Sequence, residues 1–168
     1  MELIPPSYIT VSEFIRLICF DFGLKRIGTA TGNTLTRTAQ SLHTLAAKNG
    51  QPDWSDIDQL IAQWKPHRIV VGLPLAMDGA EGPSAKRART FGERIEKHTR
   101  LEVVFVDERL SSASANTLMR ESPPGLHSSP KRPGSMSTKK SMSKKRIRAR
   151  DSLAAELILQ TYFEDYLV

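Results

Sequence analysis

Four acidic residues occupy positions at which carboxylates could meet in the folded chain. Asp21 closes the first long apolar run, Asp107 and Glu108 close the last one, and Asp151 opens the final helical pattern. If the first strand is central and the final helix crosses it, these acids converge at one edge of a sheet. Clustered carboxylates repel one another, which raises their pKa values unless a cation lies between them. Oxygen ligands without Cys or paired His favour Mg²⁺ or Mn²⁺.

Such a site suits phosphodiester chemistry, in which two metal ions about 4 Å apart activate water and stabilise the leaving oxygen. Asp107 and Glu108 are neighbours on a strand, so one of them faces away from the site. We predict Glu108 as the ligand and Asp107 as a structural acid paired with Arg109 or another nearby cation. Asp151 would also suit a helix start without any metal, because the helix dipole favours an acid there.

Cations flank the predicted acid site. Lys25 and Arg26 follow Asp21 in a glycine-containing turn, and Arg109 follows Glu108 directly. Contacts to phosphates position a nucleic acid without reading its sequence. We therefore predict Lys25, Arg26 and Arg109 as phosphate contacts.

The elements that must position these residues begin with three extended segments, at 14–20, 27–31 and 36–43. Short turns join them, which predicts an antiparallel meander. Helical and apolar extended patterns then alternate. We expect a helix capped by Asp53 or Ser55, a strand over 68–73, a helix capped by Ser84, a strand over 101–106, a helix from Ser111 or Ser112 to 121, and a helix from Asp151.

This order predicts an α/β fold with a mixed five-stranded sheet and helices on both faces. The last two strands should be parallel and joined by a right-handed crossover. The 168 residues suit one domain, 1–168, with an N-terminal extension over 1–13. Cys19 is the only cysteine, which suits a reducing cytoplasm. The first residues do not resemble a signal peptide, and no stretch is long and apolar enough to span a membrane.

The net charge of +6 comes from one segment. Residues 122–150 hold nine Lys and Arg and no acid, and they are rich in Ser, Pro and Gly. Such a composition buries too little surface to order itself, which predicts a flexible loop. This loop could be an electrostatic arm for a polyanion or only a solvated linker. For the arm, we predict contacts from Lys139, Lys140, Lys144 and Lys145.

Four motifs in order, FDFGLKRIGTA, VVGLPLAMDG, VDERLSS and RDSLAAELILQTYF, resemble the YqgF/RuvX family of small bacterial proteins. The resemblance extends from about Leu17 to Tyr166. It implies an RNase H-like fold related to Holliday junction resolvases, a cytoplasmic location, and Mg²⁺ or Mn²⁺ dependence. The family's catalytic acids correspond to Asp21, Glu108 and Asp151.

The resemblance also implies a nuclease that matures the 5′ end of pre-16S rRNA, with structured RNA or ribosomal particles as partners. Three alternatives stay open. One is a Holliday junction resolvase that cuts branched DNA, and another is an RNA- or ribosome-binding module that no longer cuts. A sugar-kinase or actin-like ATPase also opens with Asp-x-Gly, but the length argues against two lobes of that kind.

Overall fold

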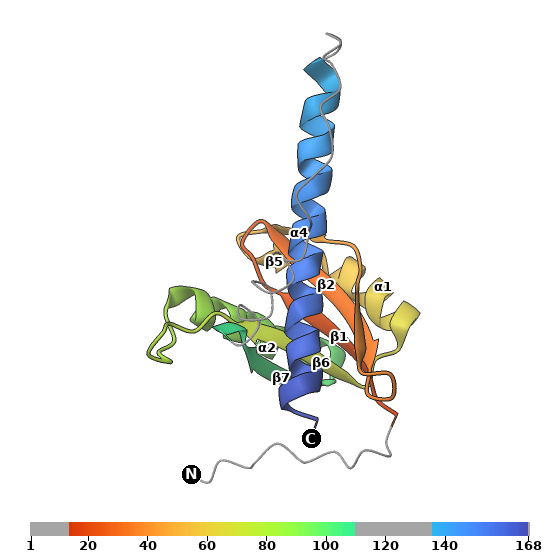
Figure 1. The fold of residues 1–168 in the computed structure, drawn as a ribbon, viewed down its shortest axis with the longest axis vertical. Coiled ribbons are helices and arrows are strands. Elements are labelled where there is room, and N and C mark those ends of the chain that lie inside the picture. Colours follow the sequence, from red (N-terminus) through yellow and green to blue (C-terminus); the bar gives the residue numbers. More distant parts are fainter. Residues whose placement is uncertain (1–13, 110–135, 168) are drawn as a thin grey trace, which may run out of the picture.

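A mixed β-sheet with helices on both faces forms the body of the protein in the computed structural model (Figure 1). The structure describes residues 14–109 and 136–167, and leaves the side chains of 136–149 outside the description. The elements in chain order are β1 (Arg16–Asp21), β2 (Arg26–Asn33), β3 (Thr38–Ser41), β4 (Leu45–Lys48), β5 (Gln51–Pro52), α1 (Trp54–Trp64), β6 (Arg68–Leu73), α2 (Pro83–Thr99), β7 (Glu102–Asp107) and α4 (Met136–Asp165).

Strand β1 lies at the centre of the sheet, whose order is β5-β4-β2-β1-β6-β7 with β3 also paired to β2. β1 is antiparallel to β2 and parallel to β6, and β6 is parallel to β7. The predicted meander and the predicted parallel pair are therefore confirmed. Within the described residues the sheet has seven strands, because a hairpin of β4 and β5 adds two to the predicted five.

The β4–β5 hairpin turns at Asn49 and Gly50, which have φ values of 52° and 78°. Two consecutive residues with positive φ are typical of the type I′ turn, which Asn-Gly favours and which matches the twist of paired strands. The hairpin extends the sheet beside the β1–β2 turn. It thus adds a wall close to the residues that follow Asp21.

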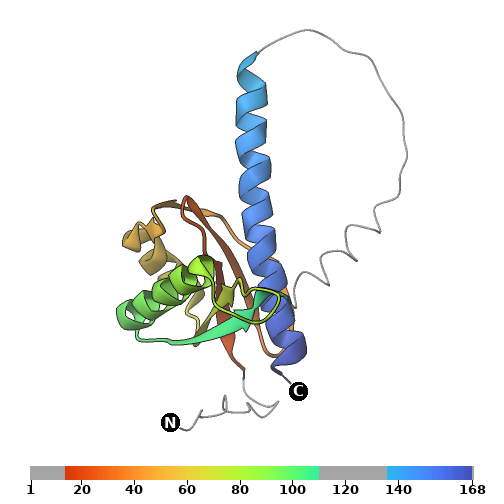
Figure 2. The same ribbon diagram turned by 90° about the vertical axis from the view of Figure 1, so that its left-hand side faces the viewer.

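The two faces of the sheet build separate cores, and side chains alternate between them along β1. Ile18 and Phe20 pack in the core under α1 and α2, while Leu17 and Cys19 pack under α4. Figure 2 shows α1 and α2 on one side of the sheet and α4 on the other. The prediction of helices on both faces is confirmed.

The starts of α1 and α2 differ. Asp53 caps α1, and its Oδ1 accepts a hydrogen bond from the Ser55 backbone N at 3.0 Å, as predicted. The predicted cap of the second helix at Ser84 is wrong, because α2 begins at Pro83 after Gly82 and has no side-chain cap. Proline suits this first position, since its fixed φ is already helical and its missing N–H would have had no partner in the helix.

Helix α4 begins earlier than the sequence predicts. Residues 136–150 were expected in a loop and the helix at Asp151, but one helix runs from Met136 to Asp165. The loop prediction is therefore wrong for 136–150, while 1–13, 122–135 and the predicted helix over 111–121 lie outside the described residues. The prolines and glycines that suggested a loop all precede residue 135, and the Lys, Arg, Met and Ala that follow are good helix formers.

The first half of α4 extends past the edge of the sheet, and its second half covers one sheet face (Figures 1 and 2). Ala155, Leu159 and Phe163 pack in the core on that face. None of the helices in the described ranges is both long and apolar enough to cross a membrane. Asp151 lies where the helix reaches the sheet.

Candidate active site

Alternation along the strands directs two of the predicted acids to the face covered by α4. Leu17 and Cys19 of β1 lie in the core under α4, and Asp21 continues this alternation. Val106 of β7 lies in the same core, so Glu108, two residues later, continues toward the same face. Both carboxyls are thus placed at the carboxyl ends of strands on one side of the sheet.

Gly72 leaves room for Glu108 above strand β6. A Cβ at Gly72 would collide with Oε1 of Glu108 and would lie 2.7 Å from Cδ1 of Ile158 in α4. The parallel register of β1 and β6, continued by one residue, places Gly72 beside Asp21. The Glu108 side chain therefore lies over the strand that adjoins Asp21, with no β6 side chain in that position.

Gly28 leaves room for the backbone of α4 at Asp151. In the β1–β2 register, Gly28 is the direct partner of Asp21. A Cβ at Gly28 would overlap the carbonyl oxygen of Asp151 and lie 3.2 Å from the Ser152 N. The α4 backbone therefore crosses β2 in direct contact at Gly28. This contact places Asp151 next to Asp21, although the two residues are distant in sequence.

Hydrogen bonds hold this part of α4 against the sheet. The Ser152 hydroxyl and the Thr44 hydroxyl are 2.8 Å apart, and one turn later a Glu156 carboxylate oxygen accepts a hydrogen bond from the Ser41 backbone N at 3.0 Å. Both partners belong to the segment that follows β2. The position of Asp151 is thus fixed by packing and by polar contacts.

Two of the acids are electrically coupled and difficult to ionise. Burial, followed by the negative charge of Asp151, raises the pKa of Asp21 from 3.8 to about 6. Burial, followed by the charges of Asp21 and Asp107, raises the pKa of Glu108 from 4.5 to about 7. Burial and both carboxylates also raise the pKa of the Cys19 thiol beneath them. A divalent cation would reverse this penalty, because it favours the charged forms.

Arg26 pairs with Asp151. Its Nε donates to Oδ2 of Asp151 at 2.6 Å, in a partly exposed ion pair. The predicted phosphate contact at Arg26 therefore lies on a predicted metal ligand. In this arrangement Arg26 neutralises part of the acid cluster, and its contact with phosphate stays a prediction.

Asp107 and Arg109 form a separate pair, as predicted for one of the two adjacent acids. Arg109 Nε donates to both carboxylate oxygens of Asp107, at 3.0 and 2.9 Å, and Nη2 donates to Oδ2 at 2.6 Å. Nη1 also donates to the carbonyls of Ala76 and Met77. The guanidinium holds the pKa of Asp107 below its usual value. Arg109 thus ties the end of β7 to the loop before α2.

The donor chemistry of the cluster fits a hard divalent cation, because Asp21, Glu108 and Asp151 offer only carboxylate oxygens. As they stand, no three His, Cys, Asp or Glu side chains in the described part of the chain are grouped closely enough to hold a metal ion. The ion pair with Arg26 engages the Asp151 carboxylate. Arg26 contacts Oδ2 of Asp151, so a metal ion shared by all three acids would bind Oδ1 or displace Arg26.

The profile of the RuvX family, described as Holliday junction resolvase, matches residues 15–165. The chain belongs to the RuvX family. It is 41% identical over 150 residues to a protein of Actinobacillus succinogenes named "Putative pre-16S rRNA nuclease", covering 89% of this chain and 95% of that one. A protein of the same name from Cronobacter sakazakii is 39% identical over 150 residues, covering 89% and 96%.

The RNase H-like fold that the motifs implied for this RuvX-family chain is confirmed. The fowlpox virus resolvase, solved in complex with Holliday junction DNA, matches with a TM-score of 0.50 over 92% of this chain and 100% of that one. The two sequences are only 11% identical, so the likeness concerns the fold.

The remaining predicted contacts of the RuvX-family chain lie on two elements. Lys25 is exposed in the β1–β2 turn beside Arg26. The four predicted lysines of the basic segment lie in the part of α4 that extends past the sheet, and their side chains are outside the described residues: Lys139, Lys140, Lys144 and Lys145. Gly28 and Gly72 are site positions that the sequence motifs did not predict, although a glycine inside a strand often marks a close approach of backbone or side chain.

Proposed function

We propose that this RuvX-family chain is a divalent-metal-dependent endonuclease that processes the 5′ end of pre-16S rRNA. The observation that carries the proposal is the convergence of Asp21 and Glu108 at Gly72, on the sheet face covered by α4. Burial raises the pKa of both half-buried carboxyls, and neighbouring negative charges raise it further. The names of the two relatives support pre-16S rRNA as the substrate. Asp21, Glu108 and Asp151 are the proposed catalytic residues and metal ligands.

Mg²⁺ or Mn²⁺ held by these carboxylates would supply activated water and stabilisation of the leaving oxygen. The chain itself supplies position and charge. Gly28 and Gly72 allow Asp151 and Glu108 to approach the end of β1, and the surrounding core holds their backbones in place. If a metal ion displaces Arg26 from Asp151, Arg26 would be available to contact a substrate phosphate.

Proton release is part of this function. Asp21 and Glu108 have pKa values of about 6 and about 7, so both carboxyls lose protons between mildly acidic and neutral pH. Ligand carboxylates must be deprotonated to bind metal. Metal affinity should therefore rise with pH up to about 7 and then level off.

The test is cleavage by the purified full chain in Mg²⁺, Mn²⁺ or EDTA. The substrates are an RNA with the 5′ leader of pre-16S rRNA, an unstructured RNA, a four-way DNA junction and linear duplex DNA. We expect metal-dependent cleavage of the leader RNA, its loss in Glu108→Gln, and its retention in Asp165→Asn. Asp165 is a matched control because it is exposed at the far end of α4, about 21 Å along the helix from Asp151.

Two other functions have support. The family description favours branched DNA, and faster cleavage of the junction than of the leader RNA would establish it. The pairing of Asp151 with Arg26 favours an RNA- or ribosome-binding module without catalysis. RNA binding without cleavage in either metal would establish that function and overturn the nuclease proposal.

A further inference from the structure

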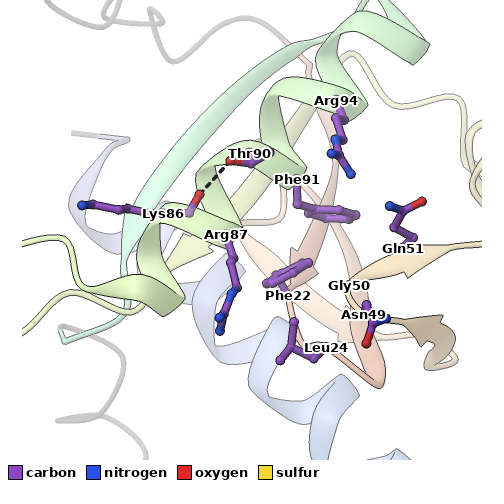
Figure 3. Close-up of a pocket in the computed structure, with 10 residues that line it drawn as sticks. All are labelled: Phe22, Leu24, Asn49, Gly50, Gln51, Lys86, Arg87, Thr90, Phe91 and Arg94. Atoms are coloured by element: carbon purple, nitrogen blue, oxygen red, sulfur yellow. Dashed lines mark hydrogen bonds between the residues drawn. The ribbon is translucent and has the colours of Figure 1, made fainter.

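A groove of about 450 Å³ lies on the side of the sheet opposite to α4 (Figure 3). It is formed where the β1–β2 turn, the β4–β5 hairpin and helix α2 meet. Its volume lies within the range of about 300 to 1,000 Å³ typical of ligand sites. The groove is lined by Phe22, Leu24, Asn49, Gly50, Gln51, Lys86, Arg87, Thr90, Phe91 and Arg94.

One part of the groove is aromatic and apolar. The ring centroids of Phe22 and Phe91 are 5.1 Å apart with an interplanar angle of 38°. Gly50, with φ of 78°, lies so close to the Phe22 ring that a Cβ there would collide with it. Leu24 is 44% exposed at the edge of the same surface. An apolar surface that stays accessible beside polar groups is a feature of sites for amphipathic ligands.

The other part of the groove is cationic. Arg87 and Arg94 are exposed, and both side chains extend from α2 toward the rings in Figure 3. Neither forms an ion pair within the described residues, and no acid lines the groove. Lys86 points away in the same view. The hydrogen bond from Arg89, and then the charges of Arg89 and Lys86, lower the pKa of Glu81.

Arg87 and Arg94 are seven residues apart, so they lie on one side of α2 at about 10 Å from each other along the axis. Two cations at that spacing suit a chain of phosphates better than a single phosphate. Phe91 is buried and supports the partly exposed ring of Phe22 from below. A partly exposed aromatic ring beside a positively charged groove can bind single-stranded nucleic acid, because a base stacks on the ring while cations contact the backbone.

We propose that this groove binds a single-stranded segment of the RNA substrate, an inference that rests on the proposed function. A base packs against Phe22 and Leu24, and Arg87 and Arg94 contact phosphates. Asn49 and Gln51 carry amides at the rim that can donate to or accept from the base edges.

The groove and the acid cluster adjoin along the chain, because Phe22 follows Asp21 directly. Phe22 packs with the core under α1 and α2, whereas Asp21 continues the alternation of Leu17 and Cys19 toward the face under α4. The β1–β2 turn, with exposed Leu24 and Lys25, lies between the two sites. An RNA strand that passes around this turn contacts the groove on one face of the sheet and Asp21 on the other. The groove therefore holds the substrate strand beyond the bond that is cut.

Binding is tested without cleavage, in EDTA, on the Asp21→Asn protein. A fluorescent single-stranded RNA oligonucleotide is titrated at several salt concentrations with three proteins. The first carries Asp21→Asn alone, the second also carries Arg87→Gln/Arg94→Gln, and the third also carries Lys97→Gln. Lys97 is a matched control, because it is an exposed cation of α2 outside the groove. Loss of two phosphate contacts should reduce the slope of log affinity against log salt by about 1.4, and the control should leave it unchanged.

The aromatic contact is tested with Phe22→Leu, which keeps an apolar side chain, and urea unfolding checks that the variant is folded. Removal of a stacking ring should weaken RNA binding roughly 5- to 150-fold. RNA carrying 4-thiouridine should crosslink to peptides that contain Phe22 or Phe91. Salt slopes of the Arg87/Arg94 variant that match the Lys97 control, or crosslinks confined to other peptides, would overturn the inference.

The two proposals fail in different ways. Absence of cleavage in Mg²⁺ and Mn²⁺ overturns the nuclease but leaves RNA binding in the groove measurable in EDTA. Metal-dependent cleavage, together with a salt slope of RNA affinity that is unchanged by Arg87→Gln/Arg94→Gln, overturns only the proposal that RNA binds in the groove. With an active nuclease, Arg87→Gln/Arg94→Gln should raise KM for long RNA, whereas Lys97→Gln should leave KM unchanged.

Discussion

Replacement of Asp21 by Asn should stabilise the protein at pH 8 and abolish metal-dependent cleavage. Asn keeps the volume of the side chain and removes its charge, so both effects have the same cause. The side chain is half-buried at the end of β1, and Asp151 adds a second negative charge nearby. In the absence of metal, ionised Asp21 therefore opposes folding.

The magnitude follows from the shift in pKa. The value rises from 3.8 to about 6 in the folded chain. Each pKa unit corresponds to about 1.4 kcal/mol, so ionised Asp21 costs up to about 3 kcal/mol in the folded state. Asn retains a buried polar group, and its desolvation offsets part of this gain. We expect a net increase of about 1 to 2 kcal/mol in the free energy of unfolding at pH 8.

The effect of Asp21 on the free energy of unfolding depends on pH. The folded state binds the Asp21 proton more tightly than the unfolded state, so the contribution of this group to stability is fully present below about pH 4. It is lost as the pH rises through about 6. The stability difference between Asp21→Asn and the unsubstituted protein should therefore be small at pH 4 and largest at pH 8.

The assay is urea unfolding of both proteins in EDTA at pH 4 and pH 8. Asp107→Asn provides a contrast, because the hydrogen bond from Arg109 lowers the pKa of Asp107. Loss of the Asp107 charge should therefore reduce the free energy of unfolding at pH 8. Mn²⁺ at 100 times its Kd for the unsubstituted protein should raise the free energy of unfolding of that protein by about 2.7 kcal/mol. The same Mn²⁺ concentration should not stabilise Asp21→Asn. An Asp21→Asn protein less stable at pH 8, or a difference equal at both pH values, would refute this reasoning.

Three further predictions concern neighbouring features. Gly28→Ala should cost about 1 to 3 kcal/mol in urea unfolding and slow cleavage, since its Cβ would displace the backbone at Asp151; Gly82→Ala, with open space around its Cβ, is the control. Arg26→Gln should increase Mn²⁺ affinity in calorimetry because a competitor for Asp151 is removed; a decrease would mean that Arg26 holds Asp151 in place for the metal. Neutralising the lysines in the first half of α4 should lower the salt slope of RNA affinity by about 0.7 per lost phosphate contact, and superimposable slopes would exclude such contacts at Lys139, Lys140, Lys144 and Lys145.

The sequence predicted the strands and the first helix well because their signals are local. The apolar run 68–73 predicts strand β6 with the bounds that the structure has, and Asp53 marks the start of α1. Alternation along a strand also predicted that only one of Asp107 and Glu108 would face Asp21. The β4–β5 hairpin was not predicted, although Asn49-Gly50 is a strong hairpin signal.

Contacts between distant parts of the chain could not be predicted in the same way. The Arg26–Asp151 ion pair joins residues 125 positions apart, and its formation depends on how α4 crosses β2. The start of α4 differs from the prediction because the average composition of 122–150 is typical of a loop, whereas helix propensity depends on where the prolines and glycines stand. The metal-ligand roles of the three acids stay predictions.

The continuity of α4 has a mechanical consequence for Asp151. The helix extends 15 residues, or about 22 Å, before it reaches Asp151, where its backbone rests on Gly28. The second half of α4 is held along its length by the core contacts of Ala155, Leu159 and Phe163. A rod that is held along one half and loaded at its free end bends where the held part begins, and the held part stays in place. A load on the outer half of α4 would therefore bend the helix near Asp151 and leave Asp151 beside Asp21. A one-residue insertion before Asp151 would turn the outer half by about 100° about the axis without moving the held part.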